Sequence, residues 1–207
     1  MRTEEFDLIV IGAGVAGGVF AASQPLNTRV LVIERDLNEP DRIIGELMQP
    51  GGIQALKELD LVHLIDGIDA QEVNGYNLIK GNERFTIHYD EVQKGIRGVG
   101  LRNGKFLGNI RRELIKLENV TLIQGNVTEI LEDKGKIIGV RYTAEDGTSV
   151  SELAKLTVVS DGPMSTLRDK LSKVNKQVTS YFMGLVIKDL KLEFPFYGHM
   201  IVSGDAP

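Results

Sequence analysis

The stretch DLIVIGAGVAG, residues Asp7–Gly17, decides the fold. It opens with a continuous apolar run that includes β-branched residues, which indicates a strand buried on both faces of a parallel sheet. Gly12, Gly14 and Gly17 follow with the spacing G-x-G-x-x-G. In this pattern the first glycine permits a tight turn, the second lets a pyrophosphate approach the backbone, and the third lets a helix pack closely on the strand. A glycine turn that serves packing alone is the alternative interpretation.

The residues after the glycine turn complete a strand–helix–strand unit. Gly14–Ser23 predicts a helix, and Arg29–Glu34 repeats the buried-strand pattern. The first turn of that helix, at Val15 and Ala16, offers unpaired N–H groups and a favourable dipole to a phosphate. Glu34 ends the second strand, about 20 residues beyond the glycine turn, where a carboxylate can accept hydrogen bonds from ribose hydroxyls. The unit predicts a dinucleotide site but does not separate FAD from NAD.

The composition is that of an ordinary globular protein, with 42% hydrophobic and 26% charged residues among 207. The formal net charge is -5 and no dense run of Lys or Arg occurs, which argues against nucleic acid as a partner. Cysteine is absent, which excludes disulfides, thiolate metal sites and cysteine nucleophiles. The histidines lack metal-ligand spacing, so we expect no metal. The longest apolar stretch, Leu8–Ala22, is too short to cross a membrane.

The rest of the chain predicts an α/β fold with a second sheet inserted into it. We expect Leu156–Ser160 in the parallel sheet with Asp7–Ile11 and Arg29–Glu34, and Gly104–Leu117 as the clearest amphipathic helix. The other expected elements are a loop over Asp36–Gly52, helices over Gly52–Leu59 and Pro163–Leu171, and strands over Val73–Lys80, Arg84–Tyr89, Val120–Gln124, Val127–Asp133, Ile137–Thr143, Tyr181–Lys188 and Gly198–Val202. A turn at Gly81–Asn82 would join the first two of these strands.

Two further clusters carry a family resemblance. The loop ERDLNEPDRIIGELMQPGG, residues Glu34–Gly52, and the run SDGPMSTLR, residues Ser160–Arg168, stand at opposite ends of the predicted cofactor domain. The first resembles, nearly residue for residue, the loop after the second strand of squalene epoxidases. The second matches the D-G-x-x-S-x-x-R motif of flavoprotein monooxygenases, with Ser160 where the family usually has cysteine. Shorter matches extend the resemblance from Phe6 to Gly204.

The resemblance implies a Rossmann-like FAD-binding domain over residues 1–72 and 90–172, and part of a substrate-domain sheet over residues 73–89 and 173–207. It also implies which residues bind FAD. Those beside the pyrophosphate would be Gly12, Gly14, Val15, Ala16 and Gly17. Those at the ribose and adenine would be Glu34, Arg35 and Val127, and those towards the flavin Arg42 and Leu47.

Three residues have less direct implied roles. Arg111 would be a phosphate or flavin neighbour, although a solvated helix arginine is an equal alternative. Asp161 would organise its turn with Ser165 and Arg168 rather than pair with phosphate, because two anions repel. Tyr76 would lie beside the active site as the candidate catalytic residue, and a buried core tyrosine is the alternative.

The activity that the resemblance implies is an FAD-dependent monooxygenation of squalene to (S)-2,3-epoxysqualene in sterol biosynthesis. Electrons would come from NADPH through a membrane-bound cytochrome reductase, at the cytosolic face of the endoplasmic reticulum. Family members continue to a second Gly-Asp motif and an apolar C-terminal membrane region. We interpret Gly204–Asp205 as a turn and not as that motif, so the chain is expected to be an incomplete fragment that is inactive alone. The alternatives are another FAD-dependent hydroxylase, a geranylgeranyl-type reductase, an NAD-dependent dehydrogenase, or a nucleotide-binding fragment without activity.

Overall fold

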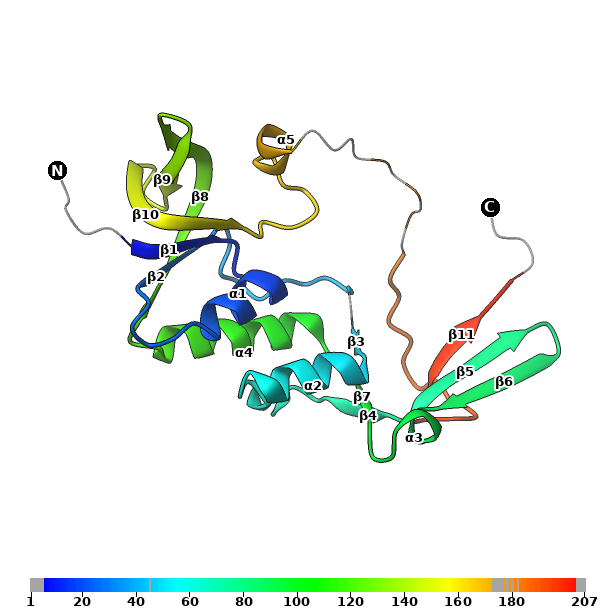
Figure 1. Ribbon diagram of the computed structural model, residues 1–207. Coiled ribbons are helices and arrows are strands. Elements are labelled where there is room, and N and C mark those ends of the chain that lie inside the picture. The colour runs from blue at the N-terminus through cyan, green and yellow to red at the C-terminus, as the bar shows by residue number, and fades with distance from the viewer. Residues whose placement is uncertain are drawn as a thin grey trace. The chain divides into compact units, whose positions relative to one another are not determined.

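The computed structural model in Figure 1 describes residues 6–44, 46–172, 177, 179, 181 and 183–203. The chain folds into two compact units: the first unit is residues 1–40 with 107–181, and the second unit is residues 41–106 with 182–207. Each unit is assembled from two separate stretches of chain. The predicted boundaries of the cofactor domain stay a prediction. The two units are defined by contacts between residues, whereas the predicted domains were defined by the ligand that each would bind.

The first unit is built on a parallel sheet. Strands β1 (Phe6–Ile11), β2 (Val30–Glu34), β8 (Val120–Asp133) and β10 (Ser149–Val159) pair in the order β8–β2–β1–β10. The predicted parallel arrangement of β1, β2 and the second half of β10 is confirmed. Strand β1 has β2 on one side and β10 on the other. The connections that follow the strands on its two sides therefore lead in opposite directions at the carboxyl end of β1. Ligands of open α/β sheets bind at such a point.

Strands β8 and β10 each change partner along their length. Up to Gln124, β8 pairs with β2; from Gly125 it pairs antiparallel with β9 (Lys136–Ala144). Similarly, β10 pairs with β9 up to Leu153 and with β1 from Ala154. The five strands thereby close into a ring, β1–β10–β9–β8–β2. The sequence predicted β8 as two strands and only the second half of β10, because a change of partner leaves little mark on the local pattern.

Two helices belong to this framework. Helix α1 (Val15–Ala22) packs against α4 (Asn103–Lys116) at Gly18, where a Cβ atom would lie 2.4 Å from Ile110 Cγ2. The amphipathic helix predicted over Gly104–Leu117 is confirmed to within one residue at each end. The core of the first unit lies inside the ring and is formed by Ile9, Ile11, Leu31, Ile33, Val140, Tyr142, Ala154 and Leu167.

The second unit contains two small sheets. In one, β3 (Leu47–Met48), β7 (Gly98–Gly100) and β4 (Gln71–Val73) pair antiparallel in that order, near α2 (Pro50–Glu58) and a short 3-10 helix, η1 (Val62–Ile65). In the other, the order is β11 (Gly198–Ile201), β5 (Gly75–Lys80) and β6 (Glu83–His88). Helix α3 (Tyr89–Val92) follows β6 directly. The hairpin predicted around Gly81–Asn82 and the strand predicted over Gly198–Val202 are confirmed.

Two predicted elements are wrong. The helix expected over Pro163–Leu171 begins only at Arg168 (α5, Arg168–Leu171), because the Ser165 hydroxyl oxygen accepts the Arg168 N–H at 2.9 Å and forms a turn first. Residues 183–188 form no strand in the described part of the chain, and Val186 and Ile187 are 59% and 65% exposed. An apolar pattern alone does not make a strand without a neighbour that shares its hydrogen bonds. The turn predicted at Gly204–Asp205 lies outside the described residues.

Candidate functional site

The glycine turn after β1 is held by backbone contacts that only glycine permits. Gly12 adopts a φ of +99° and donates its N–H to Ile33 O at 2.8 Å, joining the ends of β1 and β2. A Cβ atom on Gly17 would lie 2.0 Å from Gly12 O and 2.3 Å from Ser160 Oγ. Contacts below 3 Å to backbone atoms do not occur in real side chains, so the third glycine of the motif is required for close packing.

The other side of the turn is open. A Cβ atom on Gly14 would meet nothing within 4 Å, Val15 is 44% exposed and Ala16 is exposed. Among the residues that the structure describes, no side chain caps the N-terminus of α1 at Gly14. The first N–H groups of an α-helix lack intrahelical partners, and the helix dipole is positive there. The open backbone at Gly14 and the exposed first turn of α1 fit the pyrophosphate of a dinucleotide.

Glu34 brings a carboxylate to this turn. Its Oε2 accepts the Ala13 N–H at 2.6 Å, and its Oε1 accepts the Asp36 N–H at 3.1 Å. Each carboxylate oxygen keeps a further lone pair, which is available to a ribose hydroxyl. Arg35, next in the chain, is exposed. The structure thus places the Glu34 carboxylate beside the glycine turn, and its contact with a ribose stays a prediction.

Arg111 is not a solvated helix residue. It is 9% exposed, its Nη1 donates to Asn38 O at 2.7 Å, and its Nε donates to Ala13 O at 3.5 Å. The guanidinium therefore bridges the glycine turn and the loop after β2. Its placement beside the turn agrees with the predicted role as a phosphate or flavin neighbour, which stays a prediction.

The Ser160–Arg168 cluster closes the first unit's site from the side of β10. Ser160 donates its N–H to Ile11 O at 2.8 Å and its hydroxyl to the same oxygen at 2.9 Å. Asp161 follows, half-buried, and Arg168 Nη2 donates to Pro163 O at 2.8 Å. The sequence missed Ser160 as a tether of the glycine turn, and its place at the end of the predicted strand Leu156–Ser160 was the only signal. The organising role predicted for Asp161 stays a prediction.

Val127 lies away from this turn along β8, opposite Tyr142 of β9. Its side chain packs on the core of the first unit. Only its backbone can therefore serve a ligand, in the way that the resemblance implied, and its contact with adenine stays a prediction.

The remaining predicted site residues belong to the second unit. Arg42 is exposed, and Leu47 lies half-buried in β3 opposite Gly100. Tyr76 lies in β5, where its hydroxyl oxygen accepts a hydrogen bond from Gln49 Nε2. Gln49 Oε1 in turn accepts the Tyr89 hydroxyl at 2.6 Å. The sequence missed Gln49 and Tyr89. Gln49 stands 27 positions from Tyr76 and 40 from Tyr89, and no local pattern links the three residues.

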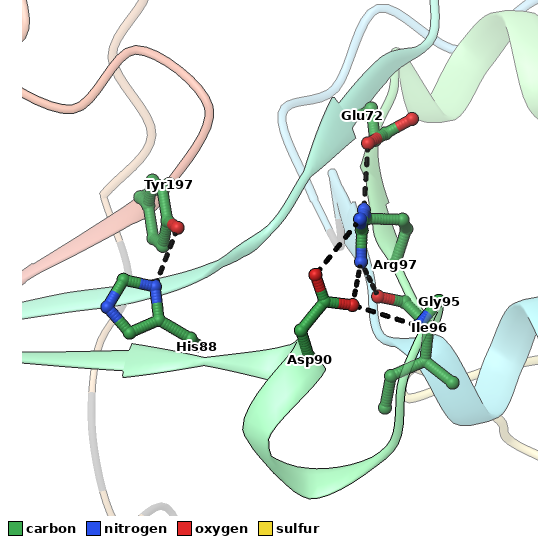
Figure 2. A network of polar contacts seen from close by, with 7 residues as sticks. All are labelled: Glu72, His88, Asp90, Gly95, Ile96, Arg97 and Tyr197. Carbon is green, nitrogen blue, oxygen red and sulfur yellow. Dashed lines mark hydrogen bonds and ion pairs between the residues drawn. The ribbon is translucent and has the colours of Figure 1, made fainter.

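An arginine fastens the segment around Tyr89. Figure 2 shows Arg97 between Asp90 of α3 and Glu72 of β4, with Nη1 to Asp90 Oδ1 at 2.6 Å and Nε to Glu72 Oε1 at 2.9 Å. The Gly95 N–H also donates to Asp90 at 2.8 Å. The hydrogen bond from Arg97 and that from Gly95 lower the pKa of Asp90, so the ion pair persists in mildly acidic solution.

The second unit also contains an open cavity of about 1000 Å³, between α2 and the segments 65–72 and 93–99. Its wall carries both signs of charge, including Lys57, Asp69 and Arg97, and none of the predicted site residues. Among the described residues there is no cluster of His, Asp or Glu that could hold a metal ion. In the same residues no helix is long and apolar enough to span a membrane.

Solved structures with a similar fold include a flavin-dependent brominase and a monooxygenase. The flavin-dependent brominase Bmp2 aligns with a TM-score of 0.69 and 24% identity over 81% of this chain and 40% of its own. The p-nitrophenol 4-monooxygenase PnpA of Pseudomonas putida DLL-E4 aligns with a TM-score of 0.71 and 24% identity over 83% of this chain and 44% of its own. At these identities the likeness establishes the fold alone. The predicted Rossmann-like α/β fold is confirmed.

Sequence comparison identifies closer relatives. The family model for squalene epoxidase matches residues 153–207. Squalene epoxidase 3 of Arabidopsis thaliana is 42% identical over 206 residues, covering 98% of this chain and 39% of the plant protein. Squalene epoxidase erg1 of Schizosaccharomyces pombe is 38% identical over 213 residues, covering 100% of this chain and 47% of the yeast protein. The chain thus spans less than half the length of these relatives. The resemblance inferred from Glu34–Gly52 and Ser160–Arg168 is confirmed, and the chain is related to the squalene epoxidases over nearly its whole length.

Proposed function

We propose that this chain is the FAD-binding portion of a squalene monooxygenase. The observation that carries the proposal is the glycine turn, open at Gly14 and flanked by Glu34, in a chain related to squalene epoxidases. The enzyme would place one atom of O2 in the terminal alkene of squalene to give (S)-2,3-epoxysqualene, with the other atom released as water. The two electrons would come from NADPH through a cytochrome reductase.

The residues of the first unit would divide the binding of FAD among them. The turn from Gly12 to Gly17, including Gly14, Val15 and Ala16, would hold the pyrophosphate with backbone N–H groups. Glu34 and Arg35 would hold the ribose and adenine, and Val127 would contact adenine through its backbone. Arg111 would neutralise charge near the turn that it already bridges. Asp161 would shape the β10 side of the site.

The second unit would supply the flavin side and the active site. Arg42 and Leu47 would contact the flavin portion of FAD, and Tyr76 would present its hydroxyl to the reaction. Bound FAD supplies the electron storage and oxygen activation that side chains do not. The protein's own task would be to orient the alkene and exclude water.

We also propose where the full-length protein acts. It would work in sterol biosynthesis, associated with the membrane at the cytosolic face of the endoplasmic reticulum, with the reductase as its partner. These proposals rest on the relationship to squalene epoxidases. Membrane contact through an apolar C-terminal region would rest on the same relationship.

The test is a visible spectrum and a product assay on the full-length protein that contains this chain. We expect a yellow protein that retains FAD and not NAD, and epoxide that carries one oxygen from labelled O2. A colourless protein after FAD addition that is instead protected by NAD would contradict the cofactor. Hydroxylated or reduced products in place of the epoxide would point to a different flavoenzyme.

A further inference from the structure

A hydrogen-bonded chain of three side chains in the second unit indicates how its candidate catalytic residue is held. The residues come from three elements: Gln49 precedes α2, Tyr76 lies in β5, and Tyr89 is the first residue of α3. The Gln49 amide stands between the two hydroxyls and bonds to both. The two rings meet edge to face, with centroids 6.1 Å apart and planes at 90°. This ring geometry is favourable and fixes both side chains.

Tyr89 sets the direction of the hydrogen bonds. It is 8% exposed, and burial, followed by the nearby Tyr76, raises the pKa of Tyr89 to about 12. The hydroxyl therefore stays protonated at neutral pH, and its one proton is donated to Gln49 Oε1 at 2.6 Å. A primary amide carries its acceptor and its donors at opposite ends. Once Oε1 is occupied by Tyr89, the Nε2 end of Gln49 faces Tyr76 and donates to it.

Tyr89 is itself held in place by the ion pair of the next residue. Asp90 accepts from Arg97 Nη1 and Nη2 at 2.6 and 3.2 Å, and Arg97 also bonds to Glu72 of β4 (Figure 2). Helix α3 has only four residues, and so short a helix has little stability of its own. The Arg97 clamp therefore fixes the helix that begins with Tyr89.

The consequence falls on Tyr76. Its oxygen accepts a hydrogen bond from Gln49 Nε2, so its own O–H remains available to a further acceptor. Tyr76 is half-buried, whereas Tyr89 is buried. We infer that Tyr89 is a positioning residue that acts through Gln49 to keep the Tyr76 hydroxyl turned outward as a hydrogen-bond donor. This inference rests on the proposed function, in which Tyr76 faces the reaction.

The experiment compares Tyr89→Phe, Tyr76→Phe and the double variant in the full-length, FAD-loaded protein. Tyr197→Phe is the matched control, since it deletes a tyrosine hydroxyl of the second unit whose hydrogen-bond partner is His88 Nδ1, at 2.8 Å (Figure 2). We expect Tyr89→Phe to lower kcat for epoxide formation about tenfold, the effect of one lost hydrogen bond in the transition state, with KM for squalene nearly unchanged. The control should retain wild-type kcat.

The double variant carries the decisive readout. If Tyr89 acts only through Gln49 on Tyr76, its replacement has no further effect once the Tyr76 hydroxyl is gone. Gln49→Glu provides a second route at an exposed position, because a carboxylate still accepts from Tyr89 but cannot donate to Tyr76. It should match the loss in Tyr89→Phe.

Four outcomes would overturn the inference. If the wild type is active and Tyr89→Phe has the same kcat, the inference fails and the proposed function stands. The same conclusion follows if the losses of the two single variants multiply in the double variant. A wild-type protein that binds FAD but makes no epoxide overturns the proposed function and this inference together. An equal loss in Tyr197→Phe would show that any tyrosine hydroxyl of the second unit matters for stability rather than positioning.

Discussion

The glycine turn and the Tyr76–Gln49–Tyr89 cluster are candidate sites built from different kinds of contact. At the turn, backbone atoms set the geometry: Gly12 N–H bonds to Ile33 O, and Gly17 packs against Gly12 O. In the cluster, side chains 27 and 40 positions apart meet through hydroxyl and amide groups. A site built from backbone atoms requires particular residue types within a short stretch of sequence. A site built from distant side chains places almost no requirement on the residues next to each of them. The turn should therefore tolerate little substitution and the cluster more.

The sharpest separation of the two sites comes from residues 1–207 tested alone. The contacts of the turn are local, so the ADP half of FAD should still bind. Epoxidation should fall to the free-flavin background, because the chain spans 39% of its plant relative and we propose that the remainder encloses the apolar substrate. The measurement is epoxide yield with chemically reduced FAD, oxygen and solubilised squalene. Epoxide above that background would show that the second unit is sufficient for the chemistry.

A pair of glycine substitutions would test the backbone nature of the turn. Gly17→Ala places a methyl group 2.0 Å from Gly12 O, so we expect a loss of stability of about 1–3 kcal/mol or more and no measurable FAD retention. Gly14→Ala meets nothing within 4 Å, so it should fold normally and lose only affinity for FAD. Thermal unfolding with and without FAD separates the two effects. Equal stability of both variants would refute the close packing inferred at Gly17.

The Glu34 side chain bonds directly to the turn, and its replacement should have an intermediate effect. Glu34→Ala removes the acceptor of the Ala13 N–H and the predicted ribose contact, and should weaken FAD binding by about 1–3 kcal/mol. Glu34→Gln keeps one carbonyl oxygen and should lose less. Titration of the apoprotein with FAD gives both values. A loss confined to stability, with unchanged affinity, would limit Glu34 to shaping the turn.

The smallest effect is expected at the start of β1. The hydrogen bond from Lys155, followed by that from the Arg29 N–H, lowers the pKa of Asp7 below the ordinary value of an aspartate, to about 2. Because the folded-state pKa lies below the unfolded one, the ionised carboxylate stabilises the fold above pH 4, and this contribution disappears as the pH falls towards 2. Asp7→Asn should slightly lower the denaturation midpoint at pH 7 and less at pH 3. Asp133→Asn, exposed at the end of β8, serves as the control.

The features that could be predicted are those that the chain determines locally. The glycine turn, the hairpin at Gly81–Asn82 and helix α4 each follow from residue spacing within one short stretch. Tertiary partners decide the others. Tyr181–Lys188 has a strand-like composition, yet residues 183–188 form no strand in the described chain. The sequence left a solvated surface position for Arg111 as an equal alternative. Its burial depends on hydrogen bonds to Ala13 O and Asn38 O, which lie far away in the chain.

The closed ring of strands in the first unit has a consequence for the order of folding. Strands β8, β9 and β10 follow one another directly, whereas the contact between Ile11 and Ser160 joins residues 149 positions apart. Contacts that close long loops form late, because the chain loses the entropy of the open loop before the new contacts stabilise it. We therefore expect the β8–β9–β10 meander to form first and the seam between β1 and β10 last. The glycine turn lies at that seam, so during synthesis a dinucleotide could bind only after Ser160 had emerged from the ribosome.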